Sequence, residues 1–189
     1  MANEEEAILK ILKNPYESYN SRSLSKIIGI SHAGMFKLLK KLEKERILVS
    51  KSIGKARIYS INFENSLALK RAELALMLEA NNNLRWIEEF KKLKSEANFI
   101  ILFGSITRNE KEAKDVDLLV VADKDKFKII NQIISDKNKI TAKRIHLILQ
   151  SKEDFKKDLK NKNKATIEII KTGSILFGQE EFVKILCEK

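Results

Sequence analysis

Apolar residues in the first third of the chain recur at the spacing of an α-helix. One helix is predicted to end before Pro15 and a second at Gly29, and Ser31 is well placed to cap the N-terminus of a third. The apolar stripes of these helices are Ala7, Ile8, Ile11 and Leu12; Leu24, Ile27 and Ile28; and Met35, Leu38, Leu39 and Leu42. The pattern therefore predicts three short helices that share one core.

The helical pattern then gives way to two short runs typical of strands. Residues 47–49 and 56–61 are rich in β-forming side chains, and Gly54 lies where a hairpin would turn. Residues 64–96 contain almost no helix breakers, and their leucines and aromatic residues return at helical distances. We expect one or two linker helices there, interrupted near 81–83 by three consecutive asparagines.

From about residue 97 the two patterns alternate. The predicted strands are 99–103, 116–121 and 144–149, and the predicted helices are 126–134, 152–159, 165–172 and 180–186. Gly173 and Gly178 flank a segment expected to be a short turn. The expected fold class is α+β or α/β in two domains, with a three-helix and hairpin domain at 1–63, linker helices at 64–96 and a small mixed-sheet domain at 97–189.

Composition narrows the class of partner and the compartment. The chain of 189 residues carries 37 Lys and Arg against 26 Asp and Glu, a net charge of +11, which favours a polyanion such as nucleic acid, nucleotide or an anionic membrane surface. The single cysteine, Cys187, permits no internal disulfide. The acidic start, 1–6, does not resemble a secretory signal, and no apolar run is long enough to span a membrane. We therefore expect a soluble, cytoplasmic protein.

The segments 23–31 and 38–43 resemble the winged-helix DNA-binding superfamily of prokaryotic regulators. The order of a short helix, a turn, an N-capped helix and a hairpin matches that superfamily over about the first third of the chain. Arg46 departs from it, because a glycine is common before the wing. The resemblance implies an N-terminal winged helix-turn-helix, double-stranded DNA as a partner and regulation of transcription.

Charge in the same region agrees with a DNA partner. The segment from Ser23 to Arg57 contains nine cationic and two anionic residues, which gives it a net charge of +7. Cations of this kind neutralise backbone phosphates, and the N-terminal end of a recognition helix enters the major groove. The residues predicted to contact DNA are His32, Lys37, Lys41, Lys51, Lys55 and Arg57. The alternative is a domain for protein contacts whose lysines only keep its surface soluble.

A glycine and serine after one strand and two aspartates on the next form the most specific pattern in the chain. Gly104 leaves room for a phosphate to approach the backbone, and Ser105 offers a hydroxyl and an amide beside it. Asp115 and Asp117 are two residues apart on a predicted strand, so their carboxylates share one face. A divalent cation with oxygen ligands relieves the repulsion between two such carboxylates.

The segments 99–108 and 115–121 resemble the DNA polymerase β-like nucleotidyltransferases, above all their minimal members, and the resemblance extends from about residue 97 to the C-terminus. It implies transfer of a nucleoside monophosphate from a nucleoside triphosphate, with ATP as the expected substrate, to an acceptor hydroxyl. It also implies Asp115 and Asp117 as catalytic ligands of Mg²⁺ or Mn²⁺, and Gly104, Ser105 and Arg108 as the residues that bind the nucleotide.

The third carboxylate of that family has no counterpart on the next strand. His146 stands about where it belongs, and is either a general base or an ordinary strand residue. Glu153 and Asp154, just after the strand, are the only nearby substitutes. The sequence thus leaves three hypotheses: an active transferase, a degenerate DNA-binding regulator that senses a nucleotide or a partner protein, and an antitoxin-like module that neutralises a partner protein. A homodimer formed through the leucine-rich linker helices is also an open possibility.

Overall fold

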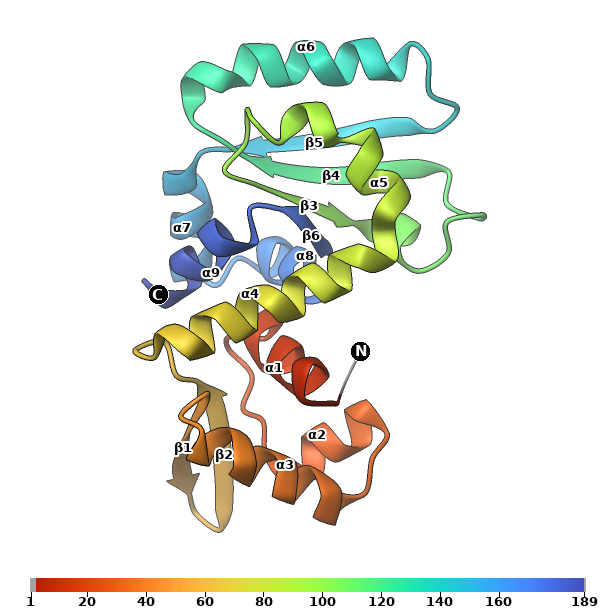
Figure 1. Ribbon diagram of the computed structural model, residues 1–189. Coiled ribbons are helices and arrows are strands. Elements are labelled where there is room, and N and C mark those ends of the chain that lie inside the picture. Colours follow the sequence, from red (N-terminus) through yellow and green to blue (C-terminus); the bar gives the residue numbers. More distant parts are fainter. Residues whose placement is uncertain (1–2, 189) are drawn as a thin grey trace. The chain divides into compact units, whose positions relative to one another are not determined.

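The computed structural model describes residues 3–188, and the chain divides into two compact units, one up to Leu78 and one from Glu79 onward. Met1, Ala2 and Lys189, the outer ends of the predicted domains 1–63 and 97–189, lie outside the described residues. Both units mix helices with a small sheet (Figure 1). No helix within 3–188 combines the length and the hydrophobicity that a membrane span needs.

The N-terminal unit has the predicted order of three helices and a hairpin. Its elements are α1 (Asn3–Lys13), α2 (Ser21–Ile28), α3 (His32–Lys44), β1 (Leu48–Ile53), β2 (Ala56–Ile61) and α4 (Ser66–Ala80), whose last two residues belong to the other unit. β1 and β2 pair antiparallel, and Gly54 at the turn has a φ of 57°. β1 is longer than the predicted strand 47–49, because each of its residues down to Ile53 has a partner on β2.

Local capping places α2 and α3 as the sequence predicts. The Ser31 side chain accepts a hydrogen bond from the Gly34 N–H, which satisfies one of the free amides at the start of α3. Gly29 closes α2 in the left-handed conformation, with a φ of 79°. The three helices and the hairpin then enclose one core, in which Leu24, Met35 and Leu39 are fully buried.

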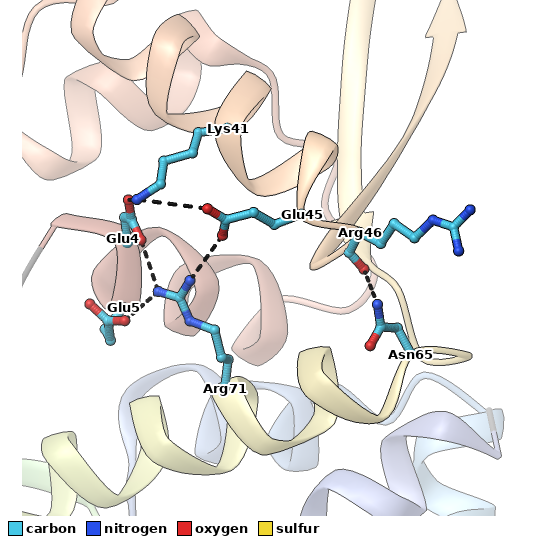
Figure 2. A network of polar contacts seen from close by, with 7 residues as sticks. All are labelled: Glu4, Glu5, Lys41, Glu45, Arg46, Asn65 and Arg71. Carbon is cyan, nitrogen blue, oxygen red and sulfur yellow. Dashed lines mark hydrogen bonds and ion pairs between the residues drawn. The ribbon is translucent and has the colours of Figure 1, made fainter.

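The structure shows how Arg46 is accommodated at a position where glycine is common in the winged-helix superfamily. Arg46 follows α3 with a φ of 60°, a conformation that favours glycine. Its carbonyl oxygen accepts hydrogen bonds from the side-chain amides of Asn62 and Asn65, at 2.9 and 3.2 Å. The Arg46 guanidinium points away from these contacts (Figure 2). Two side-chain donors from the far end of the hairpin therefore hold a strained turn that glycine would adopt without strain.

An ion-pair network joins α4 to α1 and to the end of α3. Arg71 on α4 pairs with Glu4 and Glu5 on α1 and with Glu45 after α3 (Figure 2). Lys41 of α3 contacts Glu4 at 2.6 Å. The segment predicted as linker helices, 64–96, is divided between the two units. Its residues up to Leu78, which include most of α4, belong to the first unit, and those from Glu79 onward belong to the second.

The C-terminal unit contains a four-stranded mixed sheet in the order β5-β4-β3-β6. β3 pairs antiparallel with β4 and β6, and β4 pairs parallel with β5. In chain order the elements are η1 (Asn81–Asn83), α5 (Leu84–Glu89), η2 (Lys91–Leu93), β3 (Phe99–Phe103), η3 (Gly104–Thr107), β4 (Asp115–Val121), η4 (Lys124–Lys126), α6 (Phe127–Asn138), β5 (Arg144–Gln150), α7 (Lys152–Lys160), α8 (Lys164–Thr172), β6 (Ser174–Phe177) and α9 (Gln179–Cys187).

Helices cover both faces of this sheet. On one face, Ile100, Val116 and Leu118 pack with Trp86 of α5 and Ile134 of α6 in a single apolar cluster. On the other face, the Phe99 ring contacts the rings of Phe155 on α7 and Phe182 on α9, with centroids 5.0 and 5.5 Å apart. Successive residues of a strand point to opposite faces, so Asp115 and Asp117 share the face of Phe99.

One prediction for this unit is wrong. The segment between Gly173 and Gly178 is a strand, β6, and not a short turn. It pairs with β3, and its four residues are buried, although the register shifts between Ile100 and Ile101. Four residues are too few to show a periodic pattern. Whether this segment forms a strand therefore depends on its pairing with β3, which is about 70 residues away in the sequence.

Candidate functional site

Two aspartates and one histidine meet on adjacent strands. Asp115 and Asp117 begin β4, with Val116 buried between them on the opposite face. The parallel register pairs Asp117 with His146 of β5 and Asp115 with Arg144. On the other side, Asp117 pairs with Phe103, the last residue of β3. The residues predicted as catalytic are therefore neighbours, at the edge where β3 ends and β4 and β5 begin.

The imidazole of His146 lies between the two carboxylates. Its Nδ1 is 3.5 Å from Oδ1 of Asp117, and its Nε2 is 3.9 Å from Oδ1 of Asp115. The His146 side chain is 49% exposed, and those of Asp115 and Asp117 are 44% and 29% exposed. The three groups are held by the sheet and remain open to solvent on one side, so a ligand can reach them.

Gly104 follows β3 directly and lies against Asp117. Its φ is 81°, and a Cβ at this position would overlap Oδ2 of Asp117 and come to 3.0 Å from its Cγ. From the sequence, we expected this glycine to leave room for a phosphate to approach the backbone. The structure adds a second reason: only glycine has both this backbone conformation and room for the Asp117 carboxylate.

The short turn after Gly104 carries the other residues predicted to bind the nucleotide. Ser105 is exposed, and its carbonyl accepts hydrogen bonds from the N–H groups of Arg108 and Asn109, both at 3.0 Å. The Thr107 hydroxyl donates to the Gly104 carbonyl at 2.9 Å. Arg108 is exposed, and within residues 3–188 its guanidinium forms no ion pair. Ser105 thus directly follows the glycine that lies against Asp117, and Arg108 is free to reach a ligand.

The donor atoms at this site fit a divalent cation. Asp115 and Asp117 offer oxygen ligands, and no Lys or Arg among the described residues forms an ion pair with either of them. Within 3–188 no group of three or more His, Cys, Asp or Glu side chains is arranged so that all of them could hold one metal ion, His146 with the two aspartates included. A cation held here would have two protein carboxylates and would complete its coordination with water or phosphate oxygens, as Mg²⁺ commonly does.

The two acidic residues suggested as substitutes for a third carboxylate lie elsewhere. Glu153 and Asp154 are in the first turn of α7, which follows the far end of β5. Gln150, the last residue of β5, is four positions beyond His146, a distance of about 13 Å along the strand. Asp154 also accepts a hydrogen bond from the Ser151 hydroxyl at 2.7 Å, and this bond lowers the pKa of Asp154 below its usual range. Neither residue can take the place of His146 beside the aspartates.

Two cations that the sequence did not indicate hold the loop between η3 and β4. Lys143, just before β5, donates from Nζ to the carbonyl oxygens of Glu110, at 2.9 Å, and Ala113. Arg85 on α5 forms an ion pair with the Glu110 carboxylate. No motif or spacing could have revealed these contacts, because they join segments far apart in the chain.

In the N-terminal unit, three of the residues predicted to contact DNA line one depression. A cavity of about 440 Å³ lies between the start of α2, the start of α3 and the hairpin, and its lining includes His32, Lys55 and Arg57. Arg22 lines it too, although the sequence interpretation did not name it. His32 Nε2 is 2.9 Å from the Ser21 hydroxyl, which ties α3 to α2. The cavity has no acidic residue in its lining.

The remaining predicted DNA contacts differ in how their charges are engaged. Lys37 and Lys51 are exposed and form no ion pair within the described chain. Arg57 pairs with Glu43 at 2.6 Å. Lys41 contacts Glu4, which raises the pKa of its ammonium group through that hydrogen bond. The cationic charge of Lys41 is therefore satisfied by the protein, whereas those of Lys37 and Lys51 are available to a ligand.

Residues 84–172, from the start of α5 to the end of α8, match the family model described as a nucleotidyltransferase domain. The match includes the aspartates, His146 and the glycine turn, and it covers slightly less than half of the chain. No curated protein matches this sequence.

Among solved structures, the chain is similar to the adhesin competence repressor AdcR of Streptococcus pyogenes, with a TM-score of 0.38 and 13% sequence identity over 72% of this chain and 78% of that chain. It is also similar to ZitR of Lactococcus lactis, with a TM-score of 0.35 and 13% identity over 74% of this chain and 73% of that chain. These TM-scores are too low to assign a fold or a function.

Proposed function

We propose that this protein is a DNA-binding nucleotidyltransferase, which transfers a nucleoside monophosphate from a nucleoside triphosphate to an acceptor hydroxyl. The observation that carries the proposal is the pair of half-exposed carboxylates, Asp115 and Asp117, beside the glycine turn at Gly104. That pair lies within a stretch that matches a nucleotidyltransferase domain. The acceptor and the choice of ATP as donor are expectations that follow from the sequence.

In this proposal each residue of the site has one task. Asp115 and Asp117 hold Mg²⁺ or Mn²⁺, and the bound cation would neutralise charge on the triphosphate. Ser105 and the backbone beside Gly104 contact phosphate oxygens, and Arg108 pairs with the triphosphate. The acceptor oxygen forms a bond to the α-phosphorus, the bond from that phosphorus to the bridging oxygen breaks, and pyrophosphate leaves.

In this proposal His146 receives the proton of the acceptor hydroxyl. The third carboxylate expected from the resemblance is replaced by this imidazole, which lies within 4 Å of both aspartates. A neutral imidazole can accept a proton near neutral pH.

Transfer of label from ATP tests the enzyme. Wild-type protein with α-labelled ATP and Mg²⁺ or Mn²⁺ should label an acceptor among nucleic acids, proteins or itself, and Asp115→Asn or Asp117→Asn should reduce that labelling at least about 100-fold. Asp125→Asn is the matched control, since Asp125 is an exposed carboxylate in η4, outside the site. If no label moves, and Asp115→Asn leaves metal-dependent ATP binding unchanged, the enzyme is excluded.

One observation favours a second candidate, a regulator that binds a nucleotide without transferring it. Within 3–188 the aspartates have no third carboxylate beside them. Such a protein would bind ATP with Mg²⁺ through Asp115 and Asp117, yet leave the ATP intact. Binding without labelling in the experiment above would support this candidate over the enzyme. The third hypothesis, an antitoxin-like module with a partner protein, has no specific support among the contacts of the described residues.

The DNA-binding part of the proposal rests on the N-terminal unit. Lys37, Lys51 and Lys55 are exposed without ion pairs among the described residues, and Lys55 lines a cavity beside the start of α3 that has no acidic residue. We propose that these three residues, with His32 and Arg57, contact duplex DNA. Lys41 is expected to contribute less, because Glu4 already satisfies its charge. The matching measurement is binding of the whole protein to duplex DNA at several salt concentrations.

A further inference from the structure

The loop between η3 and β4 connects two parts of the candidate site. It begins after Arg108, the cation free to reach a triphosphate, and ends at Asp115, the first carboxylate of β4. Its six residues, 109–114, form no regular element. The position of Asp115 at the mouth of the site therefore depends on what holds this loop.

Two residues from other elements hold it at the same point. The Lys143 ammonium group donates to two backbone carbonyls, those of Glu110 and Ala113. Arg85 pairs with the Glu110 side chain, and its guanidinium carbon lies 4.9 Å from the centre of the Trp86 ring. The main chain of Glu110 is thus fixed by the residue before β5, and its side chain by α5. Inside the loop, the Ala113 N–H donates to the Asn109 carbonyl at 3.0 Å.

The place of Lys143 in the chain explains why it can act on the site. It immediately precedes Arg144, which is the β5 partner of Asp115 in the parallel ladder. Its side chain reaches back to the residues just before Asp115 and does not extend toward solvent. Ala113 is 5% exposed and belongs to the apolar cluster between the sheet and the helices α5 and α6, so apolar packing also holds the loop.

We propose that Lys143, assisted by Arg85, is a positioning residue that fixes the loop 109–114 and so presents Asp115 to the bound nucleotide and its metal ion. The proposal rests on the proposed nucleotide site. Lys143 does not touch the nucleotide; it acts through the backbone of the loop. Supporting contacts of this kind commonly change metal or substrate affinity by about 10- to 100-fold when they are removed.

The matched control separates positioning from charge. Lys114 adjoins Asp115 and is exposed, and within the described residues its side chain forms no hydrogen bond or ion pair. Lys143→Met and Lys114→Met remove the same charge, and the second does so next to the carboxylate. If the effect of Lys143 were only long-range attraction for a triphosphate, the two variants would behave alike. Lys143→Arg keeps donors for the carbonyls and should rescue the positioning.

The experiment measures two properties of the whole protein and its variants: Mn²⁺-dependent binding of a non-hydrolysable ATP analogue by calorimetry, and hydrogen exchange of the amides in 109–115. We expect Lys143→Met to weaken binding about 10-fold and to speed exchange of the Ala113 amide, while Lys114→Met and Lys143→Arg remain close to wild type. Equal binding and equal exchange in the two methionine variants would overturn the proposal. A thermal melt of each variant shows whether the rest of the unit remains folded.

Failure of the proposed function gives a different result. If the wild-type protein binds no nucleotide, the nucleotide site is excluded, and hydrogen exchange alone then decides whether Lys143 holds the loop. Faster exchange in Lys143→Met but not in Lys114→Met supports the positioning role, and unchanged exchange overturns it. If the wild type binds and Glu110→Gln, which removes the Arg85 ion pair, weakens binding less than Lys143→Met, the backbone contacts are the main support.

Discussion

At the scale of single residues, the site depends on one glycine whose replacement would strain the backbone and displace a carboxylate. Gly104 combines a φ of 81° with a contact to the Asp117 carboxylate that leaves no room for a Cβ. Gly29 provides a comparison within the same chain: its φ is 79°, but a Cβ added there would meet nothing within 4 Å. The two glycines share a backbone conformation and differ in their surroundings.

Replacing each of them with alanine separates strain from steric overlap. Gly29→Ala should cost about 1 kcal/mol of stability through the left-handed backbone alone. Gly104→Ala should cost the same or more, and it should also weaken metal-dependent ATP binding at least about 10-fold because Asp117 must move. Chemical denaturation and calorimetry measure the two quantities. Unchanged ATP binding by Gly104→Ala would contradict the contact between Gly104 and Asp117.

At the scale of elements, the N-terminal unit is held together by the charges in Figure 2 as well as by its core. Arg71 of α4 reaches Glu4 and Glu5 of α1, and Lys41 of α3 reaches Glu4. The hydrogen bond from Lys41 and the one from Arg71 hold the pKa of Glu4 below its usual value, against the opposing effect of burial. Three helices are thus joined through a single carboxylate.

This arrangement predicts how stability depends on pH. A carboxyl group with a lowered pKa in the folded state stabilises it above the unfolded pKa, and this contribution disappears as the pH falls through the folded pKa. Glu4→Gln should therefore be less stable than wild type at pH 7 by about 1 kcal/mol, because Glu4 is partly exposed and its partner Lys41 is 57% exposed, so that water screens the pair. The difference should shrink below about pH 4. Urea unfolding across this pH range measures it, and a constant difference would contradict the ion pairs.

At the scale of the whole molecule, the net charge is +11, and the cations differ in whether an acidic side chain pairs with them. Lys41 and Arg71 are neutralised by acidic neighbours in the N-terminal unit. Lys37, Lys51 and Lys55 have no such partners within the described chain. A polyanion is therefore expected to bind the start of α3 and the hairpin, and not the surface formed by α1 and α4.

Salt dependence tests this expectation. With about four phosphate contacts, the logarithm of the DNA-binding constant should fall with the logarithm of salt concentration with a slope of roughly −3 to −4. Lys37→Gln combined with Lys55→Gln should reduce the magnitude of the slope by about 2. Lys94→Gln combined with Lys128→Gln removes the same charge from exposed lysines of the C-terminal unit and should leave the slope unchanged. Equal losses in both double variants would indicate an attraction of the whole molecule without a defined DNA site.

Local sequence was sufficient wherever one segment decides its own structure. The alternation of Asp115, Val116 and Asp117 placed the two carboxylates on one face, because side chains of a strand alternate whatever its partners are. The Ser31 cap and the Gly29 helix end followed from the same local chemistry. The helices and strands of both units were therefore predictable, apart from their exact ends and β6.

Tertiary structure alone decided everything that depends on two distant segments. The resemblance had already suggested His146 as a neighbour of the aspartates, but its pairing with Asp117 is set by the register of two parallel strands. β6 likewise forms because β3 offers it a partner. The contacts of Lys143 with the loop before Asp115, and of Arg71 with Glu4, join residues about 30 and 67 positions apart. Such contacts leave no periodic pattern in the sequence. Each depends on how the fold brings two distant segments together, and not on which residues are neighbours along the chain.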